Sequence, residues 1–333
     1  MSANSDCLIL AGDVGGTKTR LGLFAPANPS PILLKKETFL SATAAGVEEH
    51  IVRFLAIEPP RKVLACLGIA GPVQDGECIA TNLAWRVSEK HLRRYFGWEQ
   101  VRLVNDLTAM AYAIPILDAS DIHELHQGRP DPTGNMGLIA PGTGLGMALL
   151  FRMEGSLYPC ASEGGHVDFA PRNEKEISLL RYLMSRMEHV SVERVASGPG
   201  IFTIYSWLRE TRGDPEPTWL RNLLGSGDPA QAISAVALAG LDPVCEDTVE
   251  LFVSLVAAAA GNLALTGLTK AGMYIGGGIF PRIMPKLSSE RFLEAFAGKG
   301  RFQKLLTDIP VRIILNEDAP LLGAAQCATR SLL

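Results

Sequence analysis

Short apolar runs alternate with helix-like stretches along the chain, which is the pattern of an α/β protein. The apolar runs predict strands at Leu8–Ala11, Arg20–Phe24, Val63–Ala70, Val101–Val104, Gly137–Ala140, Met147–Phe151, Met273–Ile275 and Val311–Leu315. The other stretches predict helices at Ala45–Ala56, Ser88–Phe96, Leu107–Ile114, Glu174–Met187, Ile201–Arg209, Thr248–Leu268 and Arg291–Ala297. We expect loops at Asp131–Asn135 and Gly225–Pro229, and a surface excursion over residues 210–230, which contain three prolines.

One stretch, Leu251–Thr269, carries no charge and is long enough to span a membrane. It is rich in alanine rather than leucine, and it contains Ser254, Asn262 and Thr266. A helix that is apolar on every side is also what the centre of a large soluble domain requires. We therefore predict a buried core helix here and no membrane partner.

Two segments follow the same plan of strand, glycine-containing turn and strand. Residues 8–24 read LILAGDVGGTKTRLGLF, and residues 137–151 read GLIAPGTGLGMALLF. Each turn contains a threonine. The repetition suggests two related domains that begin in the same way, although two unrelated hairpins would give the same pattern, because glycine turns are common.

Composition narrows the class of protein. The 333 residues are 47% hydrophobic and 20% charged, which excludes a disordered or fibrous chain. The 31 Lys and Arg against 35 Asp and Glu leave a formal charge of −4, whereas nucleic-acid-binding proteins usually carry a basic excess. We expect no nucleic-acid partner. Single, scattered cysteines predict reduced thiols, mostly buried, in a cytoplasmic protein; they are Cys7, Cys66, Cys78, Cys160, Cys245 and Cys327.

The glycine turns can bind phosphate, because successive backbone N–H groups in a tight turn form a concave nest of donors. The first nest is predicted at Gly12, Asp13, Gly15, Gly16 and Thr17, the second at Gly142, Thr143 and Gly144, and a third turn at Gly276, Gly277 and Gly278. Asp13 could hold Mg²⁺, which favours one or two carboxylates together with phosphate oxygens. No P-loop and no persuasive Rossmann fingerprint is present. The three turns point to a nucleoside triphosphate held in a cleft between two domains.

Five segments resemble bacterial glucokinases of the proteobacterial type. They read LAGDVGGTKTR (residues 10–20), VNDLTAMAYAI (104–114), EGGHVDFAP (163–171), VERVASGPG (192–200) and GGGIFP (276–281). They occur in the family's order along nearly the whole chain. The resemblance implies the two-domain hexokinase/actin-like (ribonuclease H-like) fold with an inter-domain cleft. It implies a small α/β domain of residues 1–116 plus 314–333 and a large α/β domain of residues 117–313.

The resemblance also implies roles for individual residues. Asp106 is the base that takes the proton of the sugar 6-hydroxyl, and Asn105 binds the sugar beside it. The remaining ring hydroxyls are bound by Glu163, His166 and Glu193. The turn at Gly276–Gly278 lies near the adenosine. One departure is Lys18, which stands where close relatives have asparagine; lysine at this place is familiar from the ROK sugar kinases.

Structural interpretations compete with these roles. Asn105 or Asp106 could cap the helix that begins at Leu107, a use that both residue types favour. Glu163, His166 and Asp168 could form a metal cluster, but the cysteine cluster of the ROK zinc site does not follow them. Trp85 is interpreted as a packing residue.

The predicted function is ATP-dependent phosphorylation of glucose at the 6-hydroxyl, with ATP and Mg²⁺ and with Asp106 as the general base. Two alternatives stay open: a kinase for another hexose, such as mannose or N-acetylmannosamine, and a non-catalytic sugar-sensing regulator on the same fold. The resemblance further implies a cytoplasmic homodimer whose small-molecule partners are glucose and ATP.

Overall fold

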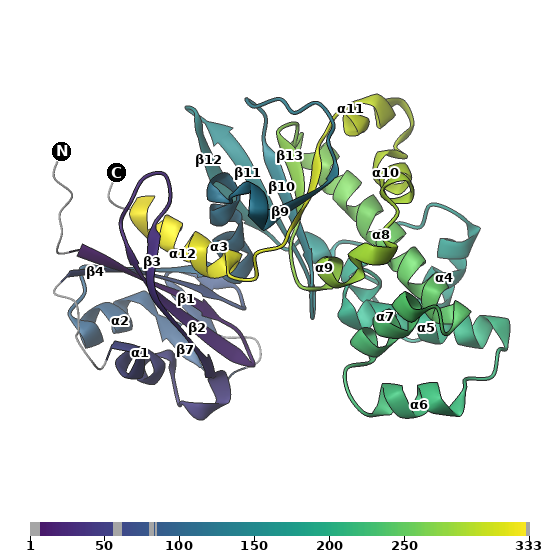
Figure 1. Ribbon diagram of the computed structural model, residues 1–333, viewed down its shortest axis with the longest axis horizontal. Coiled ribbons are helices and arrows are strands. Elements are labelled where there is room, and N and C mark those ends of the chain that lie inside the picture. Colours follow the sequence, from purple (N-terminus) through teal and green to yellow (C-terminus); the bar gives the residue numbers. More distant parts are fainter. Residues whose placement is uncertain (1–6, 56–61, 80–82, 84, 331–333) are drawn as a thin grey trace. The chain divides into compact units, whose positions relative to one another are not determined.

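The computed structural model describes residues 7–55, 62–79, 83 and 85–330. The chain divides into two compact units. Unit 1 comprises Met1–Asp121, Tyr158–Ala161 and Asn316–Leu333, and unit 2 comprises Ile122–Leu157 and Ser162–Leu315. Each unit has its own sheet with helices packed on it, so the predicted α/β class is confirmed (Figure 1). The predicted domain boundaries, 1–116 plus 314–333 and 117–313, stay a prediction.

The sheet of unit 1 has five strands in the order β3-β2-β1-β4-β8. Their bounds are β1 (Cys7–Val14), β2 (Lys18–Ala25), β3 (Ile32–Leu40), β4 (Lys62–Ile69) and β8 (Gln100–Asn105). The hairpin β1–β2 is antiparallel, as is the pair β2–β3, whereas β4 runs parallel to both β1 and β8. The carboxyl ends of the parallel strands β1, β4 and β8 therefore lie at the same side of the sheet, and Asn105 is the last residue of β8.

Helices cover both faces of this sheet. Two pack on one face, α1 (Val47–Leu55) and α2 (Glu89–Phe96), and two on the other, α3 (Asp106–Ala113) and α12 (Ala319–Thr329). Because strand side chains alternate between faces, Leu10 of β1 lies in the core with α1 and α2, while its neighbours Ile9 and Ala11 lie in the core with α3 and α12. Trp85 is buried in the first of these cores, which confirms its packing role.

Short elements complete the description of unit 1. They are β5 (Val73–Gln74), β6 (Glu77–Ile79) and β7 (Arg86–Ser88), which form a three-stranded sheet, and the 3-10 turns η1 (Ser41–Thr43), η2 (Ile114–Ile116) and η3 (Ala119–Asp121).

The second large sheet has six strands in the order β12-β11-β10-β13-β14-β9, all of them in unit 2 except the Tyr158–Ala161 part of β12. Their bounds are β9 (Ile122–His126), β10 (Met136–Pro141), β11 (Leu145–Met153), β12 (Ser156–Ser162), β13 (Gly272–Ile275) and β14 (Val311–Ile314). The hairpin β10–β11 is antiparallel, and β10 also pairs with the parallel strand β13. It thus repeats the arrangement of β1 between β2 and β4, as the sequence echo predicted.

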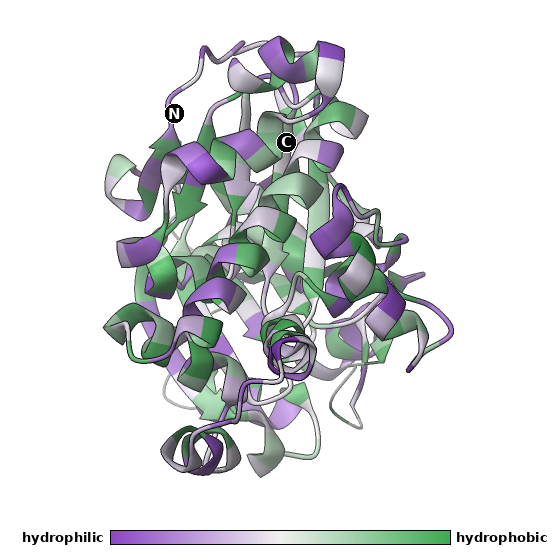
Figure 2. Ribbon diagram, turned by 90° about the vertical axis from the view of Figure 1, so that its right-hand side faces the viewer, coloured by the Kyte–Doolittle hydropathy of each residue, from purple (hydrophilic) through white to green (hydrophobic). Residues whose placement is uncertain are grey.

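The helices of unit 2 pack around α8 (Pro243–Gly267), which contacts α5, α7 and α10. Their bounds are α4 (Glu174–Met184), α5 (Gly198–Arg212), α6 (Thr218–Gly225), α7 (Pro229–Ala239), α9 (Ile279–Ile283), α10 (Ser289–Ala297) and α11 (Gln303–Thr307), with 3-10 turns η4 (Gly164–His166), η5 (Val192–Arg194), η6 (Met284–Lys286) and η7 (Gly300–Phe302). Several helices carry polar and apolar segments side by side, as expected where one face is buried (Figure 2).

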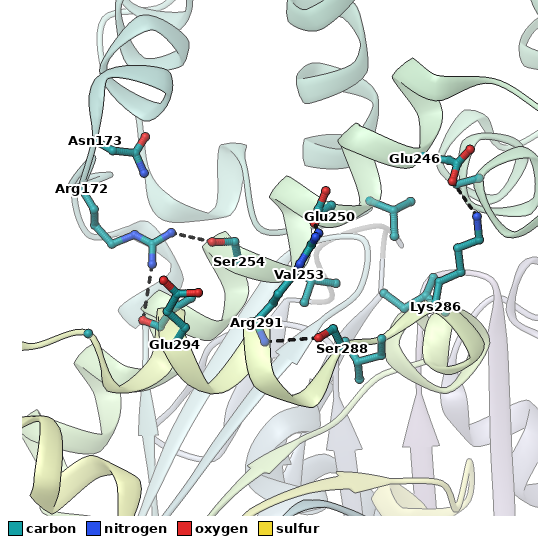
Figure 3. A pocket seen from close by; sticks show the side chains of 16 residues that line it. Arg172, Asn173, Glu246, Glu250, Val253, Ser254, Lys286, Ser288, Arg291 and Glu294 are labelled. Carbon is teal, nitrogen blue, oxygen red and sulfur yellow. Dashed lines mark hydrogen bonds and ion pairs between the residues drawn. The ribbon is translucent and has the colours of Figure 1, made fainter. Parts of the chain in front are cut away.

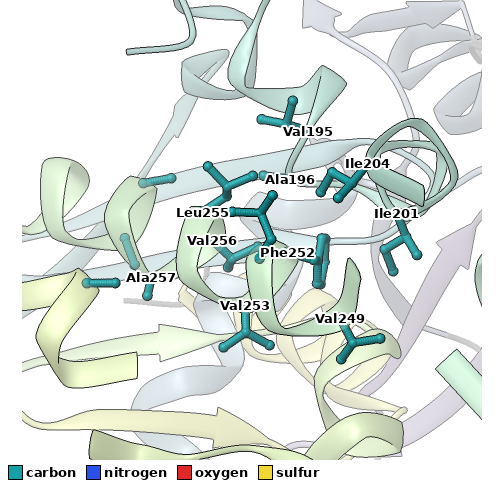
Figure 4. Close-up of a cluster of buried hydrophobic side chains, with 14 of the residues drawn as sticks. Val195, Ala196, Ile201, Ile204, Val249, Phe252, Val253, Leu255, Val256 and Ala257 are labelled. Atoms are coloured by element: carbon teal, nitrogen blue, oxygen red, sulfur yellow. The ribbon is translucent and has the colours of Figure 1, made fainter. Parts of the chain in front are cut away.

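The apolar stretch predicted as a core helix is the second half of α8. This helix passes the length and composition test for a membrane span, but 72% of its most apolar window is buried inside the protein. Phe252 and Val256 are fully buried, and they pack with Ile204 of α5 (Figure 4). The protein core therefore accounts for the apolar composition of α8.

Every predicted strand and helix is present, with ends shifted by a few residues. Several elements were not predicted. Strand β3 carries Lys35, Lys36 and Glu37 in its middle and is exposed along nearly all of its length, so it has no alternating apolar pattern to detect. The excursion expected over residues 210–230 is partly wrong: it contains α6, whose Leu220 is fully buried.

Candidate functional site

Asn105 and Asp106 stand where β8 ends and α3 begins. The Asn105 side-chain oxygen accepts hydrogen bonds from the N–H groups of Leu107 (3.0 Å) and Thr108 (3.4 Å), and its amide group donates to the Gly71 carbonyl at 3.3 Å. Asn105 is therefore the N-cap of α3, as one of the structural interpretations proposed. Asp106 is the first helical residue; its Oδ1 accepts from the Leu107 N–H at 2.8 Å, and the residue is partly exposed.

Two glycines hold α3 in place. A Cβ on Gly68 of β4 would lie 2.8 Å from the Cβ of Ala109, and a Cβ on Gly323 of α12 would lie 1.8 Å from the Ala109 carbonyl oxygen. Both contacts are closer than a side chain allows. The helix that begins with Asp106 is thus packed closely against both β4 and α12, at two positions where glycine leaves room for it.

The first glycine turn links β1 and β2. It is closed by a hydrogen bond from the Gly15 N–H to the Lys18 carbonyl (3.0 Å) and braced by Ser41, whose hydroxyl donates to the Gly15 carbonyl at 2.7 Å. Within the described part of the chain, the backbone N–H groups of Gly16 and Thr17 have no acceptor, so they can donate to a ligand oxygen. Gly12 lies inside β1 rather than in the turn, and it is buried.

Asp13 lies next to the first turn in a charged environment. The Arg20 guanidinium is 3.9 Å from Asp13 and 3.8 Å from Asp318, and Lys36 pairs with Asp318. Burial raises the pKa of Asp13 to about 6; the charge of Arg20 opposes this rise, and Asp106 and Asp318 add to it. A divalent cation would relieve the repulsion between these carboxylates.

The residues around Asp13 can bind Mg²⁺ only together with ligands that are not part of the protein. Among the described residues no three His, Cys, Asp or Glu side chains gather into a metal cluster. An ion beside Asp13 would therefore complete its coordination with phosphate oxygens and water, which is how Mg²⁺ usually binds beside nucleotides.

The second glycine turn links β10 and β11 and is closed by a hydrogen bond from the Gly142 N–H to the Gly144 carbonyl (2.8 Å). In the described residues the N–H groups of Thr143 and Gly144 have no acceptor, as in the first turn. Glu193 from η5 reaches this turn: its Oε2 accepts from the Leu145 N–H at 2.9 Å. A Cβ on Gly144 would lie 2.6 Å from that oxygen, so glycine is what admits the carboxylate.

Glu163 precedes η4, which packs on β11, and His166 is the last residue of η4. A Cβ on Gly165 would lie 2.1 Å from the Leu145 carbonyl oxygen, so the two glycines of this motif allow η4 to approach the strand. The Glu163 and His166 side chains are 75% and 61% exposed, with 3.9 Å between Glu163 Oε2 and His166 Nε2. Since η4 also contacts η5, which carries Glu193, three of the predicted sugar-binding residues come from one region of unit 2.

The third glycine turn follows β13. The Gly276 N–H donates to Ile139 within the sheet (2.8 Å), so this group is already used. Gly277 has a φ of +82°, and a Cβ there would lie 2.5 Å from the Pro141 carbonyl oxygen. The third turn therefore packs closely against Pro141, at the start of the second glycine turn. Gly278 is the N-cap of α9.

A cavity of about 810 Å³ opens between the second and third turns. It is bounded by Gly142, Thr143, Gly198 and Gly278, and by side chains of α5, α7 and α9 that include Phe202, Ser234, Leu238, Ile279 and Arg282. Its walls are mostly apolar with a few polar groups, which is the character of sites for small-molecule ligands. The nests of the second turn would lie at one side of such a ligand.

A second cavity of about 600 Å³ contains none of the predicted residues. Its polar side chains pair with one another: Lys286 with Glu246 at 2.7 Å, Arg291 with Glu250, and Arg172 with Ser254 at 2.8 Å (Figure 3). Arg172 also pairs with Glu176, which is fully buried. These pairs serve the packing of α4, α8 and α10.

The sequence analysis missed residues that contact the first turn or its charged neighbours but lie far from it in the sequence. Ser41 and Asp318 are far from the first turn in the sequence, and no local pattern marks them. Phe202 could have been found, because it follows the SGPG segment that begins α5.

Known proteins resemble this chain over nearly its whole length. Residues 10–331 match the model of the glucokinase family. The chain is 40% identical over 338 residues to a glucokinase from Nostoc punctiforme, covering 97% of this chain and 99% of that protein. A crystal structure of a glucokinase from an Antarctic psychrotroph superposes with a TM-score of 0.86 and 34% identity, covering 97% of this chain and 99% of that one. A ROK family glucokinase from Streptomyces griseus in complex with glucose and AMPPNP shares the fold, with a TM-score of 0.64, 20% identity, and coverage of 97% of this chain and 99% of that one.

Proposed function

The chain belongs to the glucokinase family, and we propose that Asp106 is the general base of its reaction. The enzyme transfers the terminal phosphoryl group of ATP to glucose, and its neighbours in structure have the actin-like kinase fold. In this reaction the sugar hydroxyl loses its proton, its oxygen bonds to the γ-phosphorus, and the bond from that phosphorus to ADP breaks. A positioned carboxylate that accepts the proton contributes about 10²–10⁴-fold to such a step.

The position of Asp106 supports this role. The residue follows a parallel strand at its carboxyl end, where ligands of α/β proteins bind. Asn105 already caps α3, so the helix does not need Asp106 for that purpose. Asn105 and Asp106 therefore have different tasks: the first fixes the start of the helix and binds the sugar, and the second accepts the proton.

The sugar hydroxyls are bound by Asn105, Glu163, His166 and Glu193. Carboxylates and an imidazole suit this task, because a site that hydrogen-bonds hydroxyls rejects analogues that lack them by about 10⁴–10⁵-fold. The exposure of Glu163 and His166 leaves them available to a ligand, and the hydrogen bond from Leu145 orients Glu193.

ATP binds through the glycine turns. The amides of Gly16, Thr17, Thr143 and Gly144 donate to phosphate oxygens, and the cavity beside Gly278 takes the adenosine. Asp13 would hold Mg²⁺, which when bound neutralises the charge of the phosphates. Arg20 keeps the Asp13 carboxylate in place through their ion pair.

We further propose the cellular setting that the family resemblance implies. The enzyme acts in the cytoplasm, where its product enters glycolysis, and it works as a homodimer without nucleic-acid or membrane partners. The free cysteines, five of them buried, support a reducing compartment, and the net charge of −4 does not favour nucleic acid.

The test is the substitution Asp106→Asn, with Asp118→Asn as a control that removes an exposed carboxylate of the same unit. We expect kcat to fall by about 10²–10⁴-fold in the first variant and to stay unchanged in the second. Glucose binding, measured by calorimetry, should persist in both. Turnover at the wild-type rate in folded Asp106→Asn protein would remove the proposed mechanism. Rates across a panel of hexoses, compared with ATP hydrolysis without sugar, measure the selectivity for glucose.

A further inference from the structure

The cavity beside Gly278 has one positively charged side chain in its wall. Of the residues that line its volume of about 810 Å³, within the described part of the chain, only Asp228 and Arg282 carry a charge. Arg282 is the fourth residue of α9 and is exposed. Its Nη2 lies 3.9 Å from the position of a Cβ built on Gly278. The guanidinium therefore lies in the part of the wall that is formed by the third glycine turn.

Three of the other polar side chains in this wall are already bonded within the protein. Thr203 and Ser234 each donate to a carbonyl one turn earlier in their own helix, at 3.1 and 2.8 Å. Asp228 accepts a backbone N–H at the start of α7 and the side-chain amide of Gln231, both at 2.9 Å. Arg282 differs from them, because its guanidinium has no hydrogen-bond or ion-pair partner among the described residues. An anionic group of a ligand can therefore bind to it without displacing a protein contact.

The binding mode of ATP proposed above would bring an anion to this cation. In that mode the nucleoside occupies the cavity, while the amides of Thr143 and Gly144 bind phosphate oxygens. Thr143 and Gly278 bound the same cavity, and the third turn packs against Pro141, at the start of the second turn. The phosphate chain would therefore leave the cavity between these two turns. Its first charged group, counted from the ribose, is the α-phosphate, which would lie nearest to the third turn.

We propose that Arg282 binds the α-phosphate of the nucleotide. A guanidinium can donate two parallel hydrogen bonds to one phosphate group, which makes arginine a selective binder of this group. The α-phosphate takes no part in the bond changes at the γ-phosphorus. The contact is therefore equally strong in the ground state and the transition state, and it acts on the KM for ATP rather than on kcat. The inference rests on the proposed function, because it takes the cavity as the nucleoside site, but it does not depend on Asp106 as the general base.

Calorimetry with adenosine and AMP tests the contact, because the two ligands differ only in the α-phosphate. We expect the wild-type protein to bind AMP about 10–100-fold more tightly than adenosine. Arg282→Gln should remove most of this difference, because it lowers the affinity for AMP and leaves the affinity for adenosine unchanged. Arg282→Lys retains the charge without the two parallel donors, so it should keep an intermediate preference for AMP. If the wild-type protein bound AMP no more tightly than adenosine, or if Arg282→Gln kept the full preference, the proposal would be overturned.

Steady-state kinetics give a second measurement of the same contact. Arg282→Gln should raise the KM for ATP by about 10–100-fold, while kcat and the KM for glucose stay at their wild-type values. Arg301→Gln removes an exposed arginine of unit 2 that does not line the cavity, and it should change none of these constants. Urea unfolding shows whether each variant is folded. A lower kcat with an unchanged KM for ATP, or an equal loss in Arg301→Gln, would contradict the contact.

A variant that fills the cavity separates this proposal from the placement of the nucleoside. Ala235 is exposed and lines the cavity from α7, so Ala235→Trp should weaken the binding of adenosine and AMP alike. Adenosine binding that is unaffected by this substitution would overturn the proposed ATP site together with the role of Arg282. Weakened adenosine binding in Ala235→Trp, combined with a full preference for AMP in Arg282→Gln, would overturn only the role of Arg282.

Discussion

The hairpins β1–β2 and β10–β11 have the same backbone plan in different surroundings. Each is antiparallel, each has a parallel strand beside its first strand, and each turn is closed by one backbone hydrogen bond. Around the first turn are the charges of Asp13, Arg20 and Asp318. Around the second are one carboxylate, Glu193, and an apolar cavity. The glycine turn provides backbone N–H donors in both hairpins. Side chains from other elements surround the first turn with charges and the second with an apolar cavity.

The charge of Asp13 provides the sharpest test of this difference. Asp13→Asn should lower kcat by about 10²–10³-fold, because it removes an electrostatic contribution to the transition state. Thr143→Val in the second turn keeps the backbone N–H donor and removes only the side-chain hydroxyl, so it should cost no more than about tenfold. Steady-state rates over a range of Mg²⁺ concentrations distinguish the two: the apparent Mg²⁺ requirement should rise for Asp13→Asn alone. Equal losses in both variants would show that the turns do not differ in this way.

Two glycines at helix contacts allow the units themselves to be compared. Gly323→Ala would place a Cβ 1.8 Å from the Ala109 carbonyl oxygen, and Gly261→Ala would place one 2.2 Å from that of Phe296, in the contact between α8 and α10. Both should lower the free energy of unfolding by about 1–3 kcal/mol, measured in urea. Only Gly323→Ala should also lower kcat of the folded enzyme, since α3 carries Asp106. Gly225→Ala, which meets no atom within 4 Å, is the control. An unchanged kcat in Gly323→Ala would show that the packing of α12 against α3 does not affect the position of Asp106.

Within the second turn, two neighbouring glycines should affect different substrates. A Cβ on Gly142 meets no atom within 4 Å, so Gly142→Ala should leave stability unchanged while raising the KM for ATP about tenfold by obstructing the phosphates. Gly144→Ala would push against Glu193 and should raise the KM for glucose by a similar factor. Steady-state kinetics with each substrate varied in turn measure both. If both variants changed the same KM, the roles of the turn and of Glu193 would need revision.

The smallest expected effect concerns pH and stability in unit 1. The ring of His50 is fully buried between Phe39 and Trp85, and burial lowers its pKa below the ordinary value of 6.5. The unfolded chain therefore binds a proton first as the pH falls, and the folded state loses stability below about pH 6.5. Asp13 acts in the opposite direction, because its raised pKa makes the folded state bind the proton first between about pH 6 and its ordinary 3.8.

The contribution of His50 can be isolated by substitution. Between pH 7.5 and pH 5.5, His50→Phe should lose less stability than wild type, while His123→Phe, at an exposed position of unit 2, should behave like wild type. Chemical unfolding at the two pH values measures the difference. Unit 2 should lose stability only at lower pH: burial raises the pKa of Asp242, but hydrogen bonds from Arg209 and the Cys245 N–H hold it below its ordinary 3.8. An identical pH response in His50→Phe and wild type would contradict the assignment.

Features that depend on neighbouring residues can be recognised in the amino-acid sequence. Glycines mark the turns, because only they combine free dihedral angles with access for a ligand. An Asn-Asp pair after an apolar run marks the start of α3, because these side chains cap helices. The charge-free stretch marks α8 as an element to be buried. These signals are local, and they also carried the resemblance that placed Asp106, Glu163 and Glu193 in their motifs.

Contacts between groups that are distant in the sequence depend on how the whole chain folds. The fold brought Asp318 to Arg20, Ser41 to the first turn and Glu193 to Gly144, across separations that no local pattern records. It also decided that β3 lies at an edge and that a cavity lies beside Gly278. The reason is that the sequence gives the charge and shape of each side chain at its own position. The electric field and the space around that side chain depend on every element that packs against it.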